Sequence, residues 1–114
     1  MKEIKAYVRH AFLEAIIRDL EEAGARDLTV VRVDALGDLV DYEDDQWHLL
    51  RKYAEKYRSL AKLEIVCTDD EAGRFLDIIA TKGHSGESGD GRAFVAPIEE
   101  AVNIRTGQRG ENAL

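Results

Sequence analysis

The stretch His84–Pro97, H-S-G-E-S-G-D-G-R-A-F-V-A-P, decides how the second half of this chain folds. Its first part carries three glycines in six residues, and glycine, serine and aspartate all disfavour a helix interior. Residues 84–91 are therefore predicted to form a loop. The apolar segment Arg92–Ala96 follows as a strand, and Pro97 ends it because proline cannot donate a hydrogen bond to a central ladder.

The glycines of this loop allow backbone N–H groups to approach an anion closely, since no Cβ stands in the way. The spacing is close to that of a nucleoside-triphosphate P-loop, but Arg92 and Ala93 replace the lysine and the magnesium-binding hydroxyl. A P-loop also joins a strand to a following helix, whereas this loop enters a strand. The residues alone leave two interpretations open, a plain helix-to-strand connector or a phosphate-binding loop.

Apolar periodicity predicts the remaining elements. Alternation indicates a strand at Glu3–Val8, and β-branched residues indicate another at Leu28–Leu36, with Leu28 and Val30 inward and Val31 and Val33 nearby. Helical spacing covers Ala11–Ala23, with Gly24 as its stop. The last two predicted elements are a strand at Lys62–Thr68 and a helix capped by Asp69 or Asp70 that runs to Lys82, with Ala72, Phe75, Leu76, Ile79 and Ala80 inward.

This order of elements predicts a single α+β domain over residues 1–114, a ferredoxin-like βαββαβ two-layer sandwich. Two helices would cover one face of a four-stranded sheet. In so small a domain the other apolar face is most economically buried against further copies of the chain, so we expect an oligomer.

Residues 38–59 form a long connection whose second half has helical spacing, through Trp47, Leu50, Tyr53 and Tyr57. A long connection in a small domain is often functional. The alternative is a helix that simply docks its apolar stripe on the sheet.

Composition narrows the function classes. Acidic residues outnumber lysine and arginine by 23 to 16, which argues against a nucleic-acid partner. No apolar run reaches the roughly 20 residues of a membrane span, and the start M-K-E-I-K lacks a signal-peptide core, so we expect a cytoplasmic, non-inserted protein.

The single cysteine, Cys67, is expected in a strand as a small buried residue. The three histidines show no metal-ligand spacing, and no catalytic set is spaced convincingly.

Three segments together resemble one known family: T-D-D at 68–70, S-G-E-S-G-D-G-R-A-F-V at 85–95 and N-I-R-T-G-Q-R-G-E-N-A-L at 103–114. They are similar to the PII signalling proteins, the nitrogen-regulatory family. The resemblance covers nearly the whole chain and fails mainly between Asp38 and Ala61. It implies a homotrimer that binds adenine nucleotide in clefts between subunits, with residues 98–114 as a C-terminal loop and tail. It also implies regulation of a protein target, an enzyme, transporter or regulator, through the effector loop 38–59.

The resemblance also implies a site. Residues 89–92 match the phosphate-cradling loop, and Arg105 matches the second arginine of the family's C-terminal R-I-R, which reaches the neighbouring subunit. The implied nucleotide-binding residues are Thr29, Gly37, Asp38, Ser85, Gly89, Asp90, Gly91, Arg92 and Arg105, and the implied effector-loop residues are Trp47, Tyr53 and Tyr57.

Three departures from the family pattern remove cations. Asp38 stands in place of an arginine, Glu87 in place of a lysine and Asn103 in place of the first arginine of R-I-R. Carboxylates repel triphosphate oxygens, so ADP or AMP is favoured over ATP, with the role of magnesium left open. The tyrosine motif R-G-x-E-Y is missing, and Leu39 replaces the glutamine of the family's 2-oxoglutarate site, so neither uridylylation nor that effector is expected.

The sequence leaves three functions to compare. The first is a nucleotide-sensing regulator, and the second is a small enzyme, which we do not expect. The third is a trimeric metal-binding or metal-tolerance protein of ferredoxin-like fold. Only His48, Cys67 and His84 would support it as metal ligands.

Overall fold

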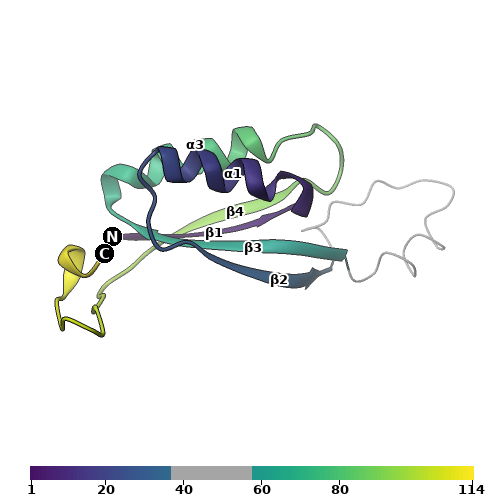
Figure 1. The fold of residues 1–114 in the computed structure, drawn as a ribbon. Coiled ribbons are helices and arrows are strands. Elements are labelled where there is room, and N and C mark those ends of the chain that lie inside the picture. Colours follow the sequence, from purple (N-terminus) through teal and green to yellow (C-terminus); the bar gives the residue numbers. More distant parts are fainter. Residues whose placement is uncertain (37–57) are drawn as a thin grey trace, which may run out of the picture.

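A four-stranded antiparallel sheet with two helices on one of its faces forms the body of the protein (Figure 1). The structure is a computed structural model, and it describes residues 1–36 and 58–114. The strand order β2-β3-β1-β4 confirms the predicted ferredoxin-like arrangement. The elements are β1 (Lys2–Val8), α1 (His10–Glu22), β2 (Thr29–Ala35), β3 (Arg58–Cys67), α3 (Asp69–Lys82), β4 (Gly91–Pro97) and the short 3-10 helix η2 (Gly110–Ala113).

The core lies between the helices and the two central strands. β1 pairs with β3 on one side and β4 on the other, and its alternate residues Ile4, Ala6 and Val8 point toward the helices and are buried. Phe75 of α3 is 1% exposed and is among the largest buried side chains. The alternation predicted for the first strand is thus confirmed. The other members of this core include Ile16, Leu20, Leu63, Ile65, Cys67, Ala72 and Ile79.

Both helix ends follow local rules, with one correction to the prediction. Gly24 ends α1 as expected, with φ of +96°, and the N–H of Ala25 donates to the Leu20 carbonyl at 2.8 Å in a Schellman arrangement. The cap of α3 is Thr68 and neither Asp69 nor Asp70. Its N–H donates to the Glu71 carboxylate at 3.0 Å in a capping box, which satisfies end groups that a lone aspartate cap would leave open.

The third strand begins earlier than the sequence pattern indicated. β3 starts at Arg58, not at Lys62, because it continues to pair with β2 as far as Ala35. Residues 58 and 59, which the sequence pattern places in the long connection 38–59, therefore belong to the sheet. The predicted helix at 46–57 and the residues Gly37, Asp38, Trp47, Tyr53 and Tyr57 lie outside the described residues.

The inward set expected for the second strand is wrong in part. Val30 and Val31 are 43% and 42% exposed, because β2 is an edge strand and neighbouring residues of a strand point to opposite faces. The two helices pack mainly on one another and against β1, β3 and β4, and less on the edge strand β2. Ala80 of α3, also expected inward, is exposed.

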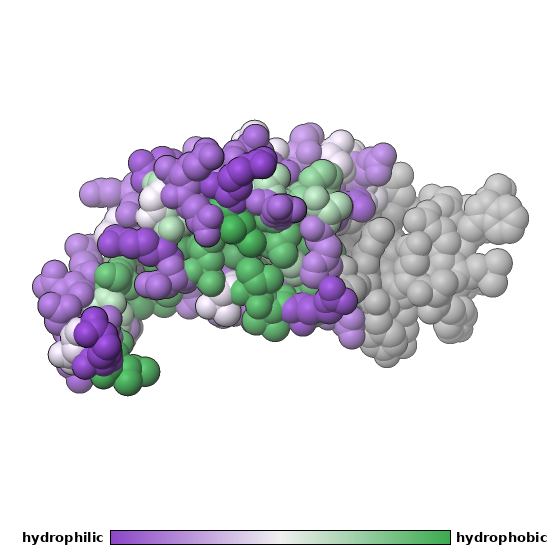
Figure 2. Space-filling view, in the orientation of Figure 1, coloured by the Kyte–Doolittle hydropathy of each residue, from purple (hydrophilic) through white to green (hydrophobic). Residues whose placement is uncertain are grey.

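The face of the sheet opposite the helices combines apolar and charged residues. Its exposed apolar side chains are Val31, Val66 and Phe94. Lys62 and Glu64 form an ion pair there at 2.7 Å. Figure 2 shows hydrophilic side chains over the helices and hydrophobic ones gathered below them, along the strands.

Neither helix of the described segments, at 13 and 14 residues, is long and apolar enough to cross a bilayer.

Candidate functional site

The glycine-rich loop lies between α3 and β4, at the end of the sheet where β1 finishes (Figure 1). Gly91 shows why the loop needs glycine: it pairs with Val8 at φ of +99°, and a Cβ on it would lie 1.8 Å from the Tyr7 carbonyl oxygen. No side chain fits at that distance. The loop therefore enters β4 by direct backbone contact with β1.

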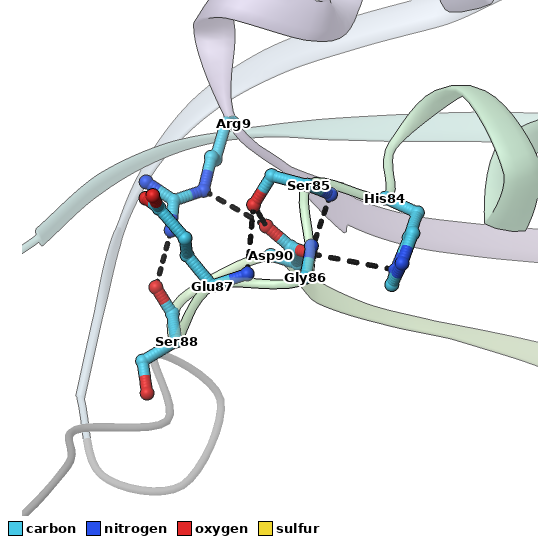
Figure 3. Close-up of polar contacts among 7 residues, drawn as sticks. All are labelled: Arg9, His84, Ser85, Gly86, Glu87, Ser88 and Asp90. Carbon is cyan, nitrogen blue, oxygen red and sulfur yellow. Dashed lines mark hydrogen bonds and ion pairs between the residues drawn. The ribbon is translucent and has the colours of Figure 1, made fainter.

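The carboxylate of Asp90 organises this loop (Figure 3). It accepts the N–H of Ser85 at 2.8 Å, the N–H of Gly86 at 3.0 Å and the Ser85 hydroxyl at 2.5 Å. Arg9 Nε donates to it at 3.1 Å, and His84 Nδ1 lies 3.8 Å away. Each carboxylate oxygen thus has at least two partners, and the side chain faces the loop itself.

These contacts set the charge state of Asp90. Partial burial alone would raise its pKa, but the hydrogen bonds from Ser85, Gly86 and Arg9 outweigh this and lower the pKa to about 2. The carboxylate is therefore ionised at neutral pH, and the cation that faces it is Arg9.

Arg9 is a site residue that the sequence interpretation missed. It lies between β1 and α1, where Nε donates to Asp90 and Nη2 donates to the Ser88 carbonyl. The signal was present in the predicted topology. Because the first and last strands of a ferredoxin-like sheet are antiparallel neighbours, the residue after Val8 must lie beside the residue before Gly91.

A pocket of about 410 Å³ opens beside the loop, between α3 and β4. Its volume is in the range of small-ligand pockets. One wall is apolar and belongs mainly to α3, while Arg92 and His84 supply cationic or titratable groups. The lining residues are Tyr7, Val8, Leu76, Ile79, Ala80, Gly83, His84, Asp90, Gly91, Arg92 and Ala93.

The structure brings together only part of the implied nucleotide site. Ser85, Gly89, Asp90, Gly91 and Arg92 are neighbours in the loop and the start of β4. No hydrogen bond among residues 1–36 and 58–114 uses the N–H groups at 88, 89 or 90.

Arg105 and Thr29 lie elsewhere in the same chain. Arg105 follows the far end of β4, and that end, at Pro97, lies about 20 Å from Gly91 at 3.3 Å per strand residue. Thr29 is on β2, separated from β4 by β3 and β1. One copy of the chain does not assemble all the predicted contacts.

Asn103, which stands where the resembled family has an arginine, shapes the C-terminal turn. Its side-chain oxygen accepts the N–H groups of Arg105 and Thr106, both at 3.1 Å. The Asn103 N–H donates to the Gln108 carbonyl at 2.8 Å, and Val102 bridges to Arg109. The turn thus carries Arg105 and the 97% exposed Ile104 on its surface.

Cys67, Ser85 and His84 are the described candidates for catalysis or metal binding, and no hydrogen bond or ion pair within the described segments joins them to one another. Cys67 is buried in β3 as expected, and burial raises the pKa of its thiol. Ser85 donates to Asp90 and not to His84. The described segments hold no group of three or more His, Cys, Asp or Glu side chains able to hold a metal ion, and His48 lies outside them.

Comparison with known proteins gives one consistent result. The family model "Nitrogen regulatory protein P-II" matches residues 1–108. Nitrogen regulatory protein P-II of Azospirillum brasilense is 32% identical over 116 aligned positions that cover all of both chains. Nitrogen regulatory protein GlnK2 of Haloferax mediterranei is 34% identical, covering all of this chain and 91% of its own. Nitrogen regulatory protein P-II 2 of Methanothermobacter thermautotrophicus is 32% identical, covering all of this chain and 97% of its own.

Proposed function

Because this chain belongs to the nitrogen regulatory protein P-II family of signal-transduction regulators, we propose that it senses adenine nucleotide in clefts between the subunits of a homotrimer. The observation that carries the proposal is the glycine-rich loop. Its first half is closed by Asp90, and residues 88–90 lead directly into Gly91 and Arg92, where backbone N–H groups and a guanidinium together suit an anionic phosphate.

The trimer is supported by two features of the single chain. Arg105 and Thr29 lie far from the loop, so a neighbouring copy must supply them if they contact the same nucleotide. The open face of the sheet also exposes Val31, Val66 and Phe94 without a covering element among the described residues. Burial of such a face against other copies is favourable.

We further propose that ADP or AMP binds at least as well as ATP. Glu87 lies within the loop and carries a negative charge. Its repulsion of the nucleotide grows with each additional phosphate group, so it disfavours ATP most. Asn103 uses its side chain to hold the C-terminal turn and contributes no cation. Among the implied site residues that the structure describes, the cations offered to the phosphates are Arg92 and Arg105.

Calorimetry with AMP, ADP and ATP, with and without magnesium, tests this proposal. Arg92→Ala and Arg105→Ala should each weaken ADP binding about ten- to hundredfold, because a charge-assisted phosphate bond contributes roughly 1.5–3 kcal/mol. The exposed Arg18→Ala on α1 is a matched control and should bind as the wild type does. ATP binding more than tenfold tighter than ADP would contradict the charge argument, and no nucleotide binding at all would overturn the proposal.

The output is proposed to be a contact of residues 38–59 with a target protein in the cytoplasm, where adenine nucleotides are abundant. The segment places Trp47 after Asp41, Glu43, Asp44 and Asp45, which favours a basic target surface. If the segment responds to nucleotide, Trp47 emission should shift when ADP is added. Emission that is blue-shifted from the start and indifferent to nucleotide would contradict this role.

We propose no catalytic activity. The metal-binding alternative has no observation in its favour among residues 1–36 and 58–114. Titration with divalent metals in the same calorimeter keeps that alternative testable, since tight metal binding without nucleotide would favour it.

A further inference from the structure

The contacts of Arg9 carry an inference that rests on the proposed function and deepens it. The guanidinium reaches from the β1–α1 junction to two different parts of the loop. Nε donates to Asp90, and Nη2 donates to the Ser88 carbonyl. In sequence these contacts span 81 and 79 residues, so they tie the loop to the opposite end of the chain.

The two acceptors of Arg9 lie on either side of Gly89. Asp90 fixes the first half of the loop through the N–H groups of Ser85 and Gly86. Ser88 begins the second half, whose N–H groups at 88, 89 and 90 make no hydrogen bond within the described segments. A side chain that holds both Asp90 and the Ser88 carbonyl therefore sets the angle between the two halves.

Arg9 also balances charge at the loop. Among the residues that the structure describes, Arg9 is the arginine that pairs with Asp90, and without it the ionised Asp90 would share the loop with Glu87. Two carboxylates next to a phosphate would repel it. The side chains of Arg9 and Asp90 are both 22% exposed, so solvent screens their interaction only in part.

We propose that Arg9 is the positioning residue of the glycine-rich loop: it neutralises Asp90 and holds the Ser88 carbonyl, so that the backbone of residues 88–91 faces a phosphate. Arg9 acts through the loop and not by touching the ligand. A lysine at this position would supply the charge but not the two-pronged geometry, because an ammonium is a point charge on a flexible stem.

The first experiment needs no nucleotide. Hydrogen exchange of the Ser85 and Gly86 amides, which donate to Asp90, should be slow in the wild type. In Arg9→Gln these two amides should exchange about ten- to hundredfold faster, the loss expected for one charge-assisted bond. Arg74→Gln is the matched control, since Arg74 also donates to a carbonyl, that of Ala23 at 2.7 Å, away from the loop. Unprotected amides in the wild type, or equal protection in Arg9→Gln, would overturn the proposal.

The second experiment separates positioning from direct contact. ADP affinity should fall about tenfold or more in Arg9→Gln, less in Arg9→Lys and not at all in Arg74→Gln. Because Arg9 acts through Asp90, Arg9→Gln should cost far less when it is added to Asp90→Asn. An equal loss in both backgrounds would show that Arg9 does not act through Asp90 and would overturn the positioning role.

Two checks keep the outcomes distinct. Arg9→Lys retains the charge and replaces Arg9→Gln as the test variant if Arg9→Gln does not fold. Circular dichroism shows whether each variant is folded. If the wild type binds no nucleotide, the proposed function fails, while the exchange of Ser85 and Gly86 still decides whether Arg9 orders the loop.

Discussion

The two faces of the sheet differ in how their apolar side chains are covered. The face that packs against α1 and α3 is buried within the single chain, and Ile4, Phe75 and Leu63 are all at or below 1% exposure. The opposite face leaves Phe94 52% exposed and places ion pairs between the apolar side chains. The first face therefore stabilises the single chain, whereas the second has apolar area left for an intermolecular contact.

The largest expected effect contrasts two phenylalanines, Phe75 of α3 in the core between the helices and the sheet, and Phe94 on the open face. Phe75→Ala should lower the free energy of unfolding by about 3–5 kcal/mol, because it removes a fully buried ring and leaves a cavity. Phe94→Ala should cost clearly less in urea denaturation but lower the sedimentation mass at micromolar concentration. Equal losses of stability with an unchanged mass would remove the distinction between the faces.

A second prediction concerns the backbone contact that both faces share. Gly91→Ala should cost about 2–4 kcal/mol, because its Cβ would collide with the Tyr7 carbonyl and its φ is positive. Gly107→Ala is the matched control, with φ of +76° but nothing within 4 Å of the added Cβ, and should cost about 1 kcal/mol. Similar losses in both variants would mean that β1 and β4 can separate without penalty.

A third prediction uses pH to measure the contribution of the glycine-rich loop to stability, separately from the two faces of the sheet. The folded-state pKa of Asp90 is lowered from 3.8 to about 2, so its ionised form stabilises the fold above about pH 4, and this contribution is lost as the pH falls through 2. Asp90→Asn should thus lower the free energy of unfolding by about 1–2 kcal/mol at pH 7, a difference that shrinks between pH 4 and pH 2. Urea denaturation across this range measures it, and a constant difference would contradict the assignment.

The smallest effect is expected on the outer side of the covering helix. Gly73 lies in α3 with nothing within 4 Å of an added Cβ, so Gly73→Ala should raise the free energy of unfolding by about 0.5–1 kcal/mol. The sedimentation mass should stay as in the wild type. A lower thermal stability would mean that this surface of α3 packs against another surface and is not exposed to solvent.

The sequence by itself determined the elements whose signals are local. Periodicity located α1 and α3, Gly24 marked the end of α1, and the glycines at 86, 89 and 91 placed the loop before β4. It also supplied the family, because the loop and tail motifs are specific, and the comparisons confirm that assignment. Such features depend on residues a few positions apart, so short stretches are sufficient to predict them.

Only the tertiary structure decided which distant residues meet. Arg9 joined Asp90 across 81 residues because β1 and β4 are antiparallel neighbours, and β3 began at Arg58 because β2 offered it a partner up to Ala35. The exposure of Val30 likewise followed from the place of β2 at the sheet edge. Strand order and edge position are properties of the packed chain, and residue type at a single position does not encode them.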